Sequence, residues 1–497
     1  MKCADRRKKM RKGKAMATVN DGRAGVYTRG SIERTMLLTA LTMLPATLAM
    51  SGYNIADSYF VGQLRDSSSL AAMSNTGPIV MLVGCVFMGI GTGIMANLAH
   101  ALGRRDAAMA RRLVSSGLLL ASLSAIFLCV LGLSSGNWIF GWMGVEGKTL
   151  VNTRKYMDIW FIGCVTGVLS MEGNTLLITA GLPKLSSIMS IVGLVINVIL
   201  DPILIFGLCG FPKMGIYGAA VATVFSQAVS AVVNMVVLYR QKLLSFERIP
   251  LHELFSLWRS IIRYAIPAVL GMLLMPIGMY ITTRFTYDLS KIRGYGDDLI
   301  AGIGMASRLE MVAFVFPMSL GRTLMPMIGQ NYGAKLYSRV KKCFYFSTLF
   351  AHVFLLFMAL VFCFGFRYVA PWIAPGQERV QKVMILFMHI VPFGFGCIEG
   401  MRFSGFTLMG CGHPRLDATL KILRVALLQV PLTWLALYME SINMIMFARL
   451  ITDVCSFIIA FTLAFLCVRK LPQDGMDVVK GEGKKHDISN SFAVKKA

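Results

Sequence analysis

The stretch "NVILDPILIFG" (197–207) is an apolar run that contains an aspartate followed directly by a proline. It closes a longer apolar segment, 186–207, which contains no other charged residue. As a helix, a segment of this length reaches across the roughly 30 Å hydrocarbon core of a membrane. Lipid offers no hydrogen-bond partners to backbone groups, so a single spanning segment is expected to be helical. The run therefore predicts a membrane helix with a buried carboxylate, Asp201.

Similar apolar segments recur along the whole chain, which has 497 residues, 56% of them hydrophobic and only 15% charged. This composition and a mean hydropathy of +0.65 exclude an ordinary soluble protein of this length. We expect an all-α integral membrane protein with about twelve spanning helices. The clearest segments are 36–62, 70–99, 113–135, 186–207, 214–239, 264–283, 343–365 and 442–468, and weaker ones lie at 156–181, 298–330, 381–411 and 417–437.

The net charge of +25 follows membrane topology rather than a nucleic-acid-binding surface. When the loops between twelve spans are assigned alternately to two sides, the side with both tails receives 35 of the 50 Lys and Arg, and the other side 11. Cytoplasmic loops of membrane proteins are enriched in Lys and Arg. We therefore expect cytoplasmic termini, a location in the plasma membrane (the inner membrane of a cell with two), contact with membrane lipid, and no nucleic-acid partner.

Two pairs of loops match each other about 230 residues apart. "IMANLAHALGRRD" (94–106) matches "LMPMIGQNYGAKL" (324–336), and "GLPK" (181–184) matches "GHPR" (412–415). Because the offset equals six spans, both copies have the same orientation, and we expect two parallel six-helix lobes with a site between them. The expected parts are a basic cytoplasmic tail (1–35), an N-lobe (36–239), a cytoplasmic linker with an amphipathic surface helix (240–263), a C-lobe (264–468) and a second cytoplasmic tail (469–497).

A second carboxylate within a span is Asp57 of "SGYNIADSYFVG" (51–62), at a depth similar to that of Asp201. Asn197 precedes Asp201 by four residues and Tyr53 precedes Asp57 by four, so each pair shares a helix face. Carboxylates with neutral oxygens suit Na⁺ or a proton, and two close carboxylates at low dielectric resist being charged together. We predict a cation site here; the alternative is that each aspartate only stabilises helix packing.

These residues also carry a resemblance to a known family. Five segments, in order between about residues 32 and 468, resemble the signatures of the multidrug and toxin extrusion (MATE) family. They are "YNIADSYFVGQL" (53–64), "LITAGLPK" (177–184), "NVILDPILIFG" (197–207), "GIYGAAVATVFSQ" (215–227) and "MPMIGQNYGAK" (325–335). The resemblance implies a twelve-helix antiporter, not an enzyme, without a resident cofactor. Its coupling ion would be H⁺ or Na⁺, and it would expel amphipathic, cationic drugs or metabolites.

The N-lobe pattern resembles the DinF-like branch of this family and related Gram-positive multidrug exporters. The resemblance implies that Asp57, Asn197 and Asp201 form the cation network, where Na⁺ is one possible ion. It adds Thr223 of "GAAVAT" to that network. It also implies that Asn174 of "EGNTLLITAG" lines the substrate cleft.

The seventh span, 264–283, differs from the NorM-like branch, in which it carries a carboxylate, because here it has none. An ion site of that kind is therefore not expected in the C-lobe. Instead, Met272, Met275 and Met279 follow one another at spacings of three and four. Flexible thioethers suit a promiscuous apolar cleft, so Met275 and Met279 are expected to line the substrate cleft with Asn174.

Other charged residues within the spans are expected to pair. Arg449 and Asp453, four apart on the last span, are expected to pair with each other. Glu399 and Arg402, three apart, are expected to stabilise packing, whereas Glu172 could attract a cationic substrate at the inner mouth.

Two other functions remain as alternatives to a monomeric drug antiporter. One is a flippase of the same superfamily for a lipid-linked sugar, which would require basic residues in its cavity, whereas the N-lobe carries carboxylates. The other is an integral-membrane enzyme. The six histidines are scattered without the spacing of a catalytic motif, which argues against that class.

Overall fold

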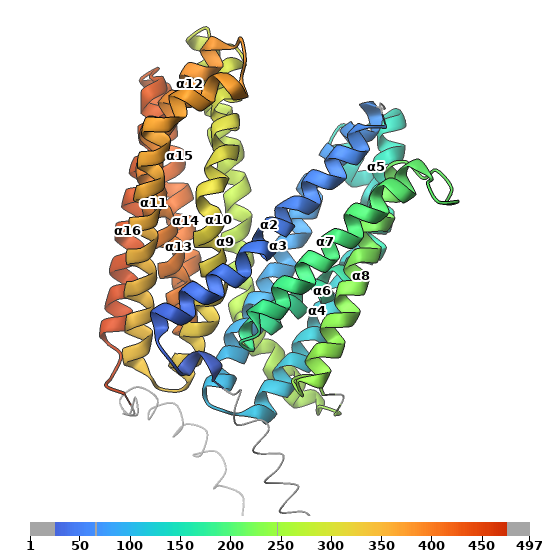
Figure 1. Ribbon diagram of the computed structural model, residues 1–497, viewed down its shortest axis with the longest axis vertical. Coiled ribbons are helices and arrows are strands. Elements are labelled where there is room, and N and C mark those ends of the chain that lie inside the picture. The colour runs from blue at the N-terminus through green and yellow to red at the C-terminus, as the bar shows by residue number, and fades with distance from the viewer. Residues whose placement is uncertain (1–24, 65–66, 246, 475–497) are drawn as a thin grey trace, which may run out of the picture.

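The computed structural model describes residues 25–64, 67–245 and 247–474, and this part of the chain is all helical. Ten helices are long and apolar enough to cross a membrane, and a bent pair of helices forms an eleventh span. A further helix of 31 residues, α2, lies beside them. The helices form two bundles (Figure 1). The expected all-α membrane fold with about twelve spans in two lobes is confirmed.

The first bundle, the N-lobe, contains α2 (Ile32–Gly62), α3 (Ser67–Gly103), α4 (Ala107–Trp142), α5 (Gly147–Ile162), α6 (Cys164–Thr179), α7 (Pro183–Phe206) and α8 (Ile216–Arg240). The second bundle, the C-lobe, contains α9 (Leu251–Ile292), α10 (Asp298–Gly333), α11 (Tyr337–Ile373), α12 (Glu378–Ile390), α13 (Phe395–Gly410), α14 (Pro414–Leu423), α15 (Val430–Tyr438) and α16 (Ile442–Arg469). Three short elements are η1 (Val26–Thr28), η2 (Val391–Gly394) and the π-helical η3 (Arg424–Gln429).

Breaks within three spans explain why there are more helices than spans. Gly163 separates α5 from α6, which are bent by 54°. Pro392 lies in the 3₁₀ turn between α12 and α13, and Pro431 follows the π-helical turn between α14 and α15. Proline has no N–H and its ring clashes with the carbonyl four residues earlier, so it interrupts the α-helical hydrogen-bond pattern.

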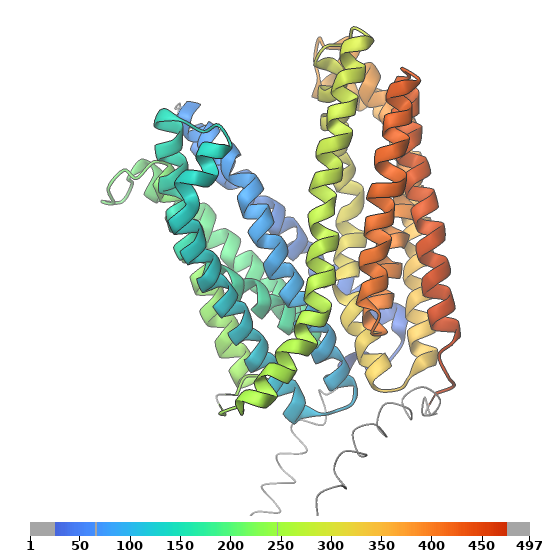
Figure 2. The ribbon, with the colours of Figure 1, turned by 180° about the vertical axis from the view of Figure 1, so that it is seen from behind.

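The predicted linker, 240–263, is not separate from the C-lobe. α9 starts at Leu251 and continues without interruption to Ile292, over 42 residues. The helix starts beneath the N-lobe, bends, and rises through the C-lobe (Figure 2). Pro267 and Pro276 lie inside it, and proline is a common cause of helix bending. The amphipathic segment is therefore the first part of the first C-lobe helix, and the expected boundary at 264 falls within that helix.

The two bundles meet at the end where both termini of the described chain lie and separate toward the other end (Figure 1). Glycines allow the close approach. A Cβ atom at Gly103 of α3 would lie 2.1 Å from the carbonyl oxygen of Gln330 in α10, and one at Gly93 would lie 2.4 Å from that of Ile261 in α9. No side chain fits at such distances, so the backbones of the two lobes pack directly against each other.

Tyr27, in the short segment before α2, links the two lobes at this same end. The side chain is 1% exposed. Its backbone N–H donates to Oε1 of Gln330 in the C-lobe at 3.1 Å, and its hydroxyl donates to the carbonyl oxygen of Ile178 in the N-lobe at 2.9 Å. Gln330 also donates from Nε2 to the carbonyl oxygen of Thr179 at 2.7 Å. One buried turn thus holds one end of the two lobes together.

Candidate functional site

Four polar side chains from three helices meet inside the N-lobe. Asp57 comes from α2, Asn197 and Asp201 from α7, and Thr223 from α8, and each is at most 7% exposed. α7 packs against both α2 and α8, and this packing brings the four residues together. The structure therefore gathers the four residues that the resemblance implied.

Asn197 lies at the centre of this group. Its Nδ2 donates to Oδ1 of Asp57 at 3.3 Å and to Oδ1 of Asp201 at 3.4 Å, and lies 3.4 Å from Oγ1 of Thr223. The Thr223 hydroxyl lies 3.3 Å from Oδ2 of Asp57. These distances are long for hydrogen bonds. The four side chains are therefore only loosely hydrogen-bonded to one another.

The group contains more acceptors than donors. Oδ1 of Asn197 and Oδ2 of Asp201 are buried and have no hydrogen-bond partner within the described residues. The carboxyl groups of Asp57 and Asp201 lie on either side of the same donor, Nδ2 of Asn197. Two ionised carboxylates have no proton to donate, and burying both charges unpaired is very costly. The arrangement therefore calls for a proton or a cation between them.

The donor set fits a hard cation. Carboxylate, amide and hydroxyl oxygens are the ligands that such ions prefer. In the part of the chain that the structure describes, no group of three or more His, Cys, Asp or Glu side chains could hold a metal ion. The chemistry of this cluster thus suits Na⁺ or H⁺ better than a transition metal.

Tyr53 lies next to the cluster rather than within it. Its hydroxyl and the hydroxyl of Ser230 in α8 both lie beside Gly193 of α7. A Cβ atom at Gly193 would lie 2.5 Å from the Tyr53 hydroxyl. Tyr53 therefore fills the space between α7 and α8 beside the four residues.

α8 carries a row of four buried polar residues, of which the sequence analysis identified only the first, Thr223. Thr223, Ser226, Ser230 and Asn234 follow one another at spacings of three, four and four, and all are buried. The two serines donate to carbonyls of their own helix, at 2.9 and 3.0 Å. The signal was present in the sequence as small polar residues at helical spacing in an apolar segment.

Asn174, predicted to line the substrate cleft, lies at the other end of this row. Its Oδ1 accepts from Ser186 of α7 and from Asn234 of α8, both at 3.4 Å. Ser186 is eleven residues from Asn197, and Asn234 is eleven residues from Thr223. At 1.5 Å per residue, Asn174 is about 16 Å from the cation cluster.

The other two residues predicted to line the cleft come from the C-lobe. Met275 and Met279 lie on α9 of the C-lobe and are 51% and 67% exposed. Glu172 is 0% exposed, packs against Gly91 of α3, and neither of its carboxyl oxygens has a partner within the described residues. The hypothesis that Glu172 faces an inner mouth is therefore wrong for this conformation, because α3 covers it.

Arg449 and Asp453 do not pair with each other, although their spacing favoured it. Nη2 of Arg449 lies 2.6 Å from Oε1 of Glu310 in α10, and Nη2 of Arg424 lies 2.6 Å from Oδ1 of Asp453. Both ion pairs thus join different helices. Contacts between helices outweigh the short-range preference along α16, because each carboxylate is fixed where a neighbouring helix presents an arginine.

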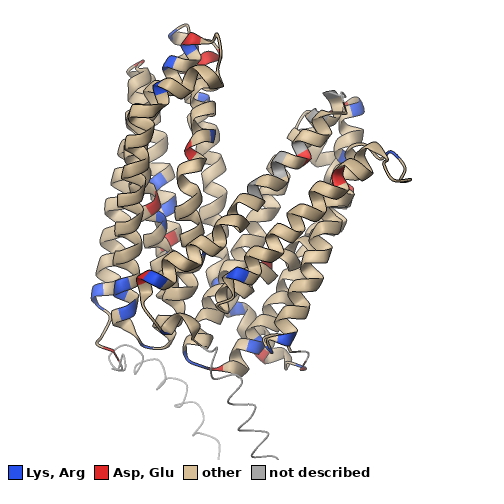
Figure 3. Ribbon diagram, viewed as in Figure 1, with Lys and Arg blue, Asp and Glu red and all other residues tan. Residues whose placement is uncertain are grey.

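Two further ion pairs lie in the C-lobe. Nη1 of Arg402 lies 2.9 Å from Oε2 of Glu399, as their spacing predicted, and Nζ of Lys421 lies 2.7 Å from Oδ2 of Asp417. Figure 3 shows basic and acidic segments side by side in the middle of the C-lobe. Lys421 and Arg424 both lie within the spanning segment Pro414–Tyr438.

Comparisons with known proteins place the chain among membrane transporters. The model of the MatE family matches residues 43–203 and 267–435, one segment in each lobe. An FAD transporter of Shewanella oneidensis is 27% identical over 436 residues, which cover 87% of this chain and 94% of that protein. The multidrug export protein MepA of Staphylococcus aureus is 24% identical over 463 residues, which cover 92% and 98%.

A solved structure shows the same fold. The Vibrio cholerae MATE transporter VcmN, in its bent form, matches with a TM-score of 0.81 at 22% identity, over 91% of this chain and 98% of that one.

Proposed function

This chain belongs to the multidrug and toxin extrusion (MATE) family, and from that premise we propose that it is an antiporter that admits a cation and expels an amphipathic organic molecule. The observation that carries the proposal is that the buried carboxylates of Asp57 and Asp201 share one hydrogen-bond donor, Nδ2 of Asn197, at 3.3 and 3.4 Å. No Lys or Arg of the described residues forms a salt bridge with either side chain. An entering H⁺ or Na⁺ would balance their charge.

Cation binding and cargo binding are coupled in this proposal because both depend on the position of helices in the N-lobe. When a cation occupies the cluster, Asn197 and Thr223 are drawn toward it, and α2 moves relative to α7. Pro45 lies inside α2, and a proline inside a helix is a common site of bending. A bend there weakens cargo binding, so cargo and cation favour different conformations of the protein. Differential affinity of this kind is what exchange requires.

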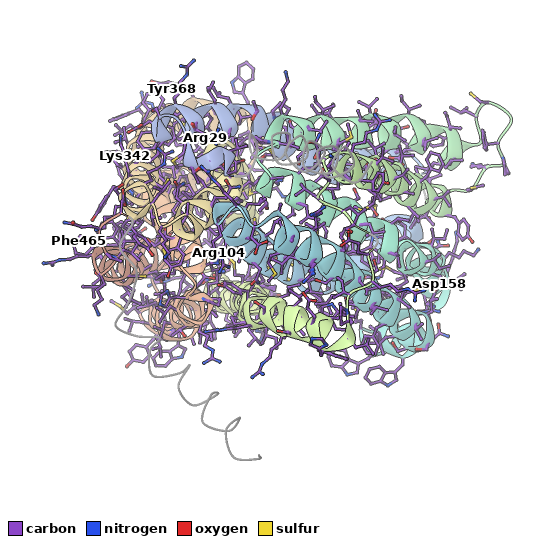
Figure 4. All side chains as sticks on the ribbon, turned by 90° about the horizontal axis from the view of Figure 1, so that it is seen from below. Arg29, Arg104, Asp158, Lys342, Tyr368 and Phe465 are labelled. Carbon is purple, nitrogen blue, oxygen red and sulfur yellow. The ribbon has the colours of Figure 1, made fainter. Side chains whose placement is uncertain are left out.

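The structure corresponds to the outward-open state in this proposal. Figure 3 shows Lys and Arg at the end where the lobes meet, and among them are Arg29, Arg104 and Lys342, which are labelled in the view from below in Figure 4. Lys and Arg are enriched on the cytoplasmic side, so this end and both chain termini are cytoplasmic in a plasma membrane. The lobes would then rock to open this end and release the cation inside.

The proposed class of cargo rests on the cargoes named for two relatives and on the charges inside the N-lobe. One relative is named as a multidrug exporter and another as an FAD transporter, and both cargo classes are amphipathic. The carboxylates of the N-lobe favour a cationic group on the cargo. The protein is proposed to act as a monomer and to leave its cargo chemically unchanged.

Efflux from proteoliposomes tests the proposal. The liposomes would contain wild type, Asp57→Asn, Asp201→Asn, or the control Asp297→Asn, which changes an exposed carboxylate outside the bundle core. Ethidium or Hoechst dye would be loaded, and a Na⁺ or H⁺ gradient imposed. Wild type and Asp297→Asn should exchange dye for one of the two ions, and the other two variants should not. Equal exchange by all four proteins would show that the aspartates are structural, and no exchange by wild type would contradict antiport of these dyes.

A further inference from the structure

The charged side chains inside the C-lobe differ in sign from those inside the N-lobe. The N-lobe cluster contains two carboxylates, and Glu172 is a third buried acid. Among the side chains of the C-lobe spans that are buried or half-buried near mid-span, five are basic and four are acidic. They are Arg322, Arg402, Lys421, Arg424 and Arg449 against Glu310, Glu399, Asp417 and Asp453.

In each of the four ion pairs in the interior of the C-lobe, the basic side chain is the more exposed partner. Arg402 is 33% exposed and its carboxylate 0%, and Arg449 is 31% exposed and its carboxylate 13%. The values are 20% and 5% for the pair of Lys421, and 12% and 0% for that of Arg424. Charged groups at membrane depth face protein or water-filled space rather than lipid. The accessible side of this cluster is therefore cationic, and the carboxylates hold the basic groups from behind.

The arginines retain donors that their partners do not use. A guanidinium carries five N–H donors. Beyond its bond to Asp453, Arg424 places Nη1 only 3.9 Å from the thioether of Met401, a weak acceptor. Arg449 lies over the ring of Phe387, 5.4 Å from its centre, which fixes the guanidinium without occupying its donors. Rigid, partly accessible guanidinium groups match the geometry of phosphate and carboxylate.

The backbone is also irregular at this cluster. Arg424 is the first residue of the π-helical turn η3. Such turns are rare and occur frequently at functional sites. The turn changes the direction of side chains along this span, and Arg424 there reaches Asp453 of α16. Arg424 also reaches Met401, the residue before Arg402, and its partner Asp453 lies one turn from Arg449 on α16, so the three arginines and their carboxylates lie close together.

We propose that Arg402, Arg424 and Arg449 form a binding site in the C-lobe for an anionic group, a phosphate or a carboxylate, of the transported molecule. The proposal rests on the transport function proposed above and narrows its cargo to molecules that carry such a group. It departs from the sequence-based expectation of a purely cationic cargo, which considered only the N-lobe.

Binding of matched probes to the purified protein in nanodiscs tests the proposal. Riboflavin 5′-phosphate and riboflavin differ only in a phosphate group, and carboxyfluorescein provides a carboxylate. The variants Arg449→Gln/Glu310→Gln and Arg424→Gln/Asp453→Asn remove each pair without leaving a buried charge unpaired. The control Arg284→Gln/Asp288→Asn neutralises an exposed pair on α9, whose atoms are 3.4 Å apart.

Wild type and the control should bind riboflavin 5′-phosphate at least tenfold more tightly than riboflavin, or should bind carboxyfluorescein. Both paired variants should lose this phosphate preference or this binding of carboxyfluorescein. A smaller phosphate preference together with no binding of carboxyfluorescein would overturn the proposal. So would a preference that survives in both paired variants. The measurement needs no ion gradient. Failure of the anion site is thus distinguishable from failure of cation-coupled exchange, which is measured with ethidium and the Asp57 and Asp201 variants.

Discussion

The backbone N–H of Tyr27 donates to Oε1 of Gln330 at 3.1 Å, although 303 residues separate the two along the chain. Gln330 also donates to the carbonyl oxygen of Thr179 at the end of α6. One side chain of the C-lobe therefore satisfies buried backbone groups of both η1 and α6. These bonds exist only while the lobes are together at this end. They therefore stabilise the conformation that is open at the opposite end.

Gln330→Leu should shift the protein away from this conformation. The change leaves the N–H of Tyr27 and the carbonyl of Thr179 buried without partners, at about 1–3 kcal/mol each. Spin labels at the exposed positions 142 and 372, at the far ends of α4 and α11, would report the separation of the lobes. The long-distance population should fall by about tenfold or more. The exposed Gln377→Leu should leave it unchanged, and an unchanged distribution in Gln330→Leu would contradict the role of these bonds.

Gly103→Ala should act on the same equilibrium by a steric route. The added Cβ would lie 2.1 Å from the carbonyl oxygen of Gln330, so the two backbones must move apart. We expect the same spin-label pair to show shorter distances at the far end. Gly141→Ala, where no atom lies within 4 Å of the added Cβ, is the matched control. If both variants resemble wild type, the close approach does not control the conformation.

Thr223→Val should weaken cation binding more than it weakens folding. The change removes the hydroxyl that lies 3.3 Å from Asp57 but keeps the shape of the side chain. Hydrogen bonds to charged groups contribute about 1.5–3 kcal/mol, so the cation concentration for half-maximal exchange should rise about tenfold. Thr223→Ser keeps the hydroxyl and should remain near wild type. Equal effects of the two substitutions would assign Thr223 to packing alone.

Asn174→Ala should change cargo recognition and leave cation binding intact. Asn174 is about 16 Å from the cation cluster and bonds only to Ser186 and Asn234 among the described side chains. We expect a several-fold higher apparent KM for ethidium in proteoliposomes. The half-maximal cation concentration should not change. A change in the cation response with constant KM would place Asn174 in coupling instead.

Asp453 should couple energetically more strongly to Arg424 than to Arg449. Removing one partner of a buried ion pair typically costs about 3–5 kcal/mol, so Asp453→Asn should lower the thermal stability of the purified protein strongly. In a double-mutant cycle, Arg424→Gln should recover part of that loss, with a coupling of about 1–3 kcal/mol. The cycle with Arg449→Gln should show a smaller coupling than the cycle with Arg424→Gln. The reverse result would mean that the pairing along α16 dominates in solution.

The N-lobe cluster could be predicted from sequence because its members stand out. A carboxylate in a long apolar segment is conspicuous, and a spacing of four places Asn197 and Asp201 on one face. Spacing does not show that α2 and α8 pack on that face, and only the resemblance to a family linked Asp57 and Thr223 to it. Asn174, which was predicted for the substrate cleft and not for this cluster, lies near Asn234, eleven residues along α8 from Thr223.

The C-lobe could not be predicted in the same way. Its acids and bases are numerous enough that several pairings satisfy simple spacing. The correct partner of Arg449, Glu310, depends on how α10 packs beside α16. The role of Tyr27 was also invisible, because a lone tyrosine in a polar N-terminal segment carries no periodic signal. Packing between distant segments decides such contacts, and local sequence does not encode it directly.

The separation of acidic and basic clusters into two lobes has an electrical consequence. In a cell with a negative interior, an entering cation and a departing anionic cargo both move with the membrane voltage. One elementary charge that crosses the full membrane gains about 2.3 kcal/mol per 100 mV, and exchange of one cation for one monovalent anion therefore gains about twice that amount. A transporter that binds opposite charges in opposite lobes could thus run on voltage alone, even when the ion concentrations on the two sides are equal.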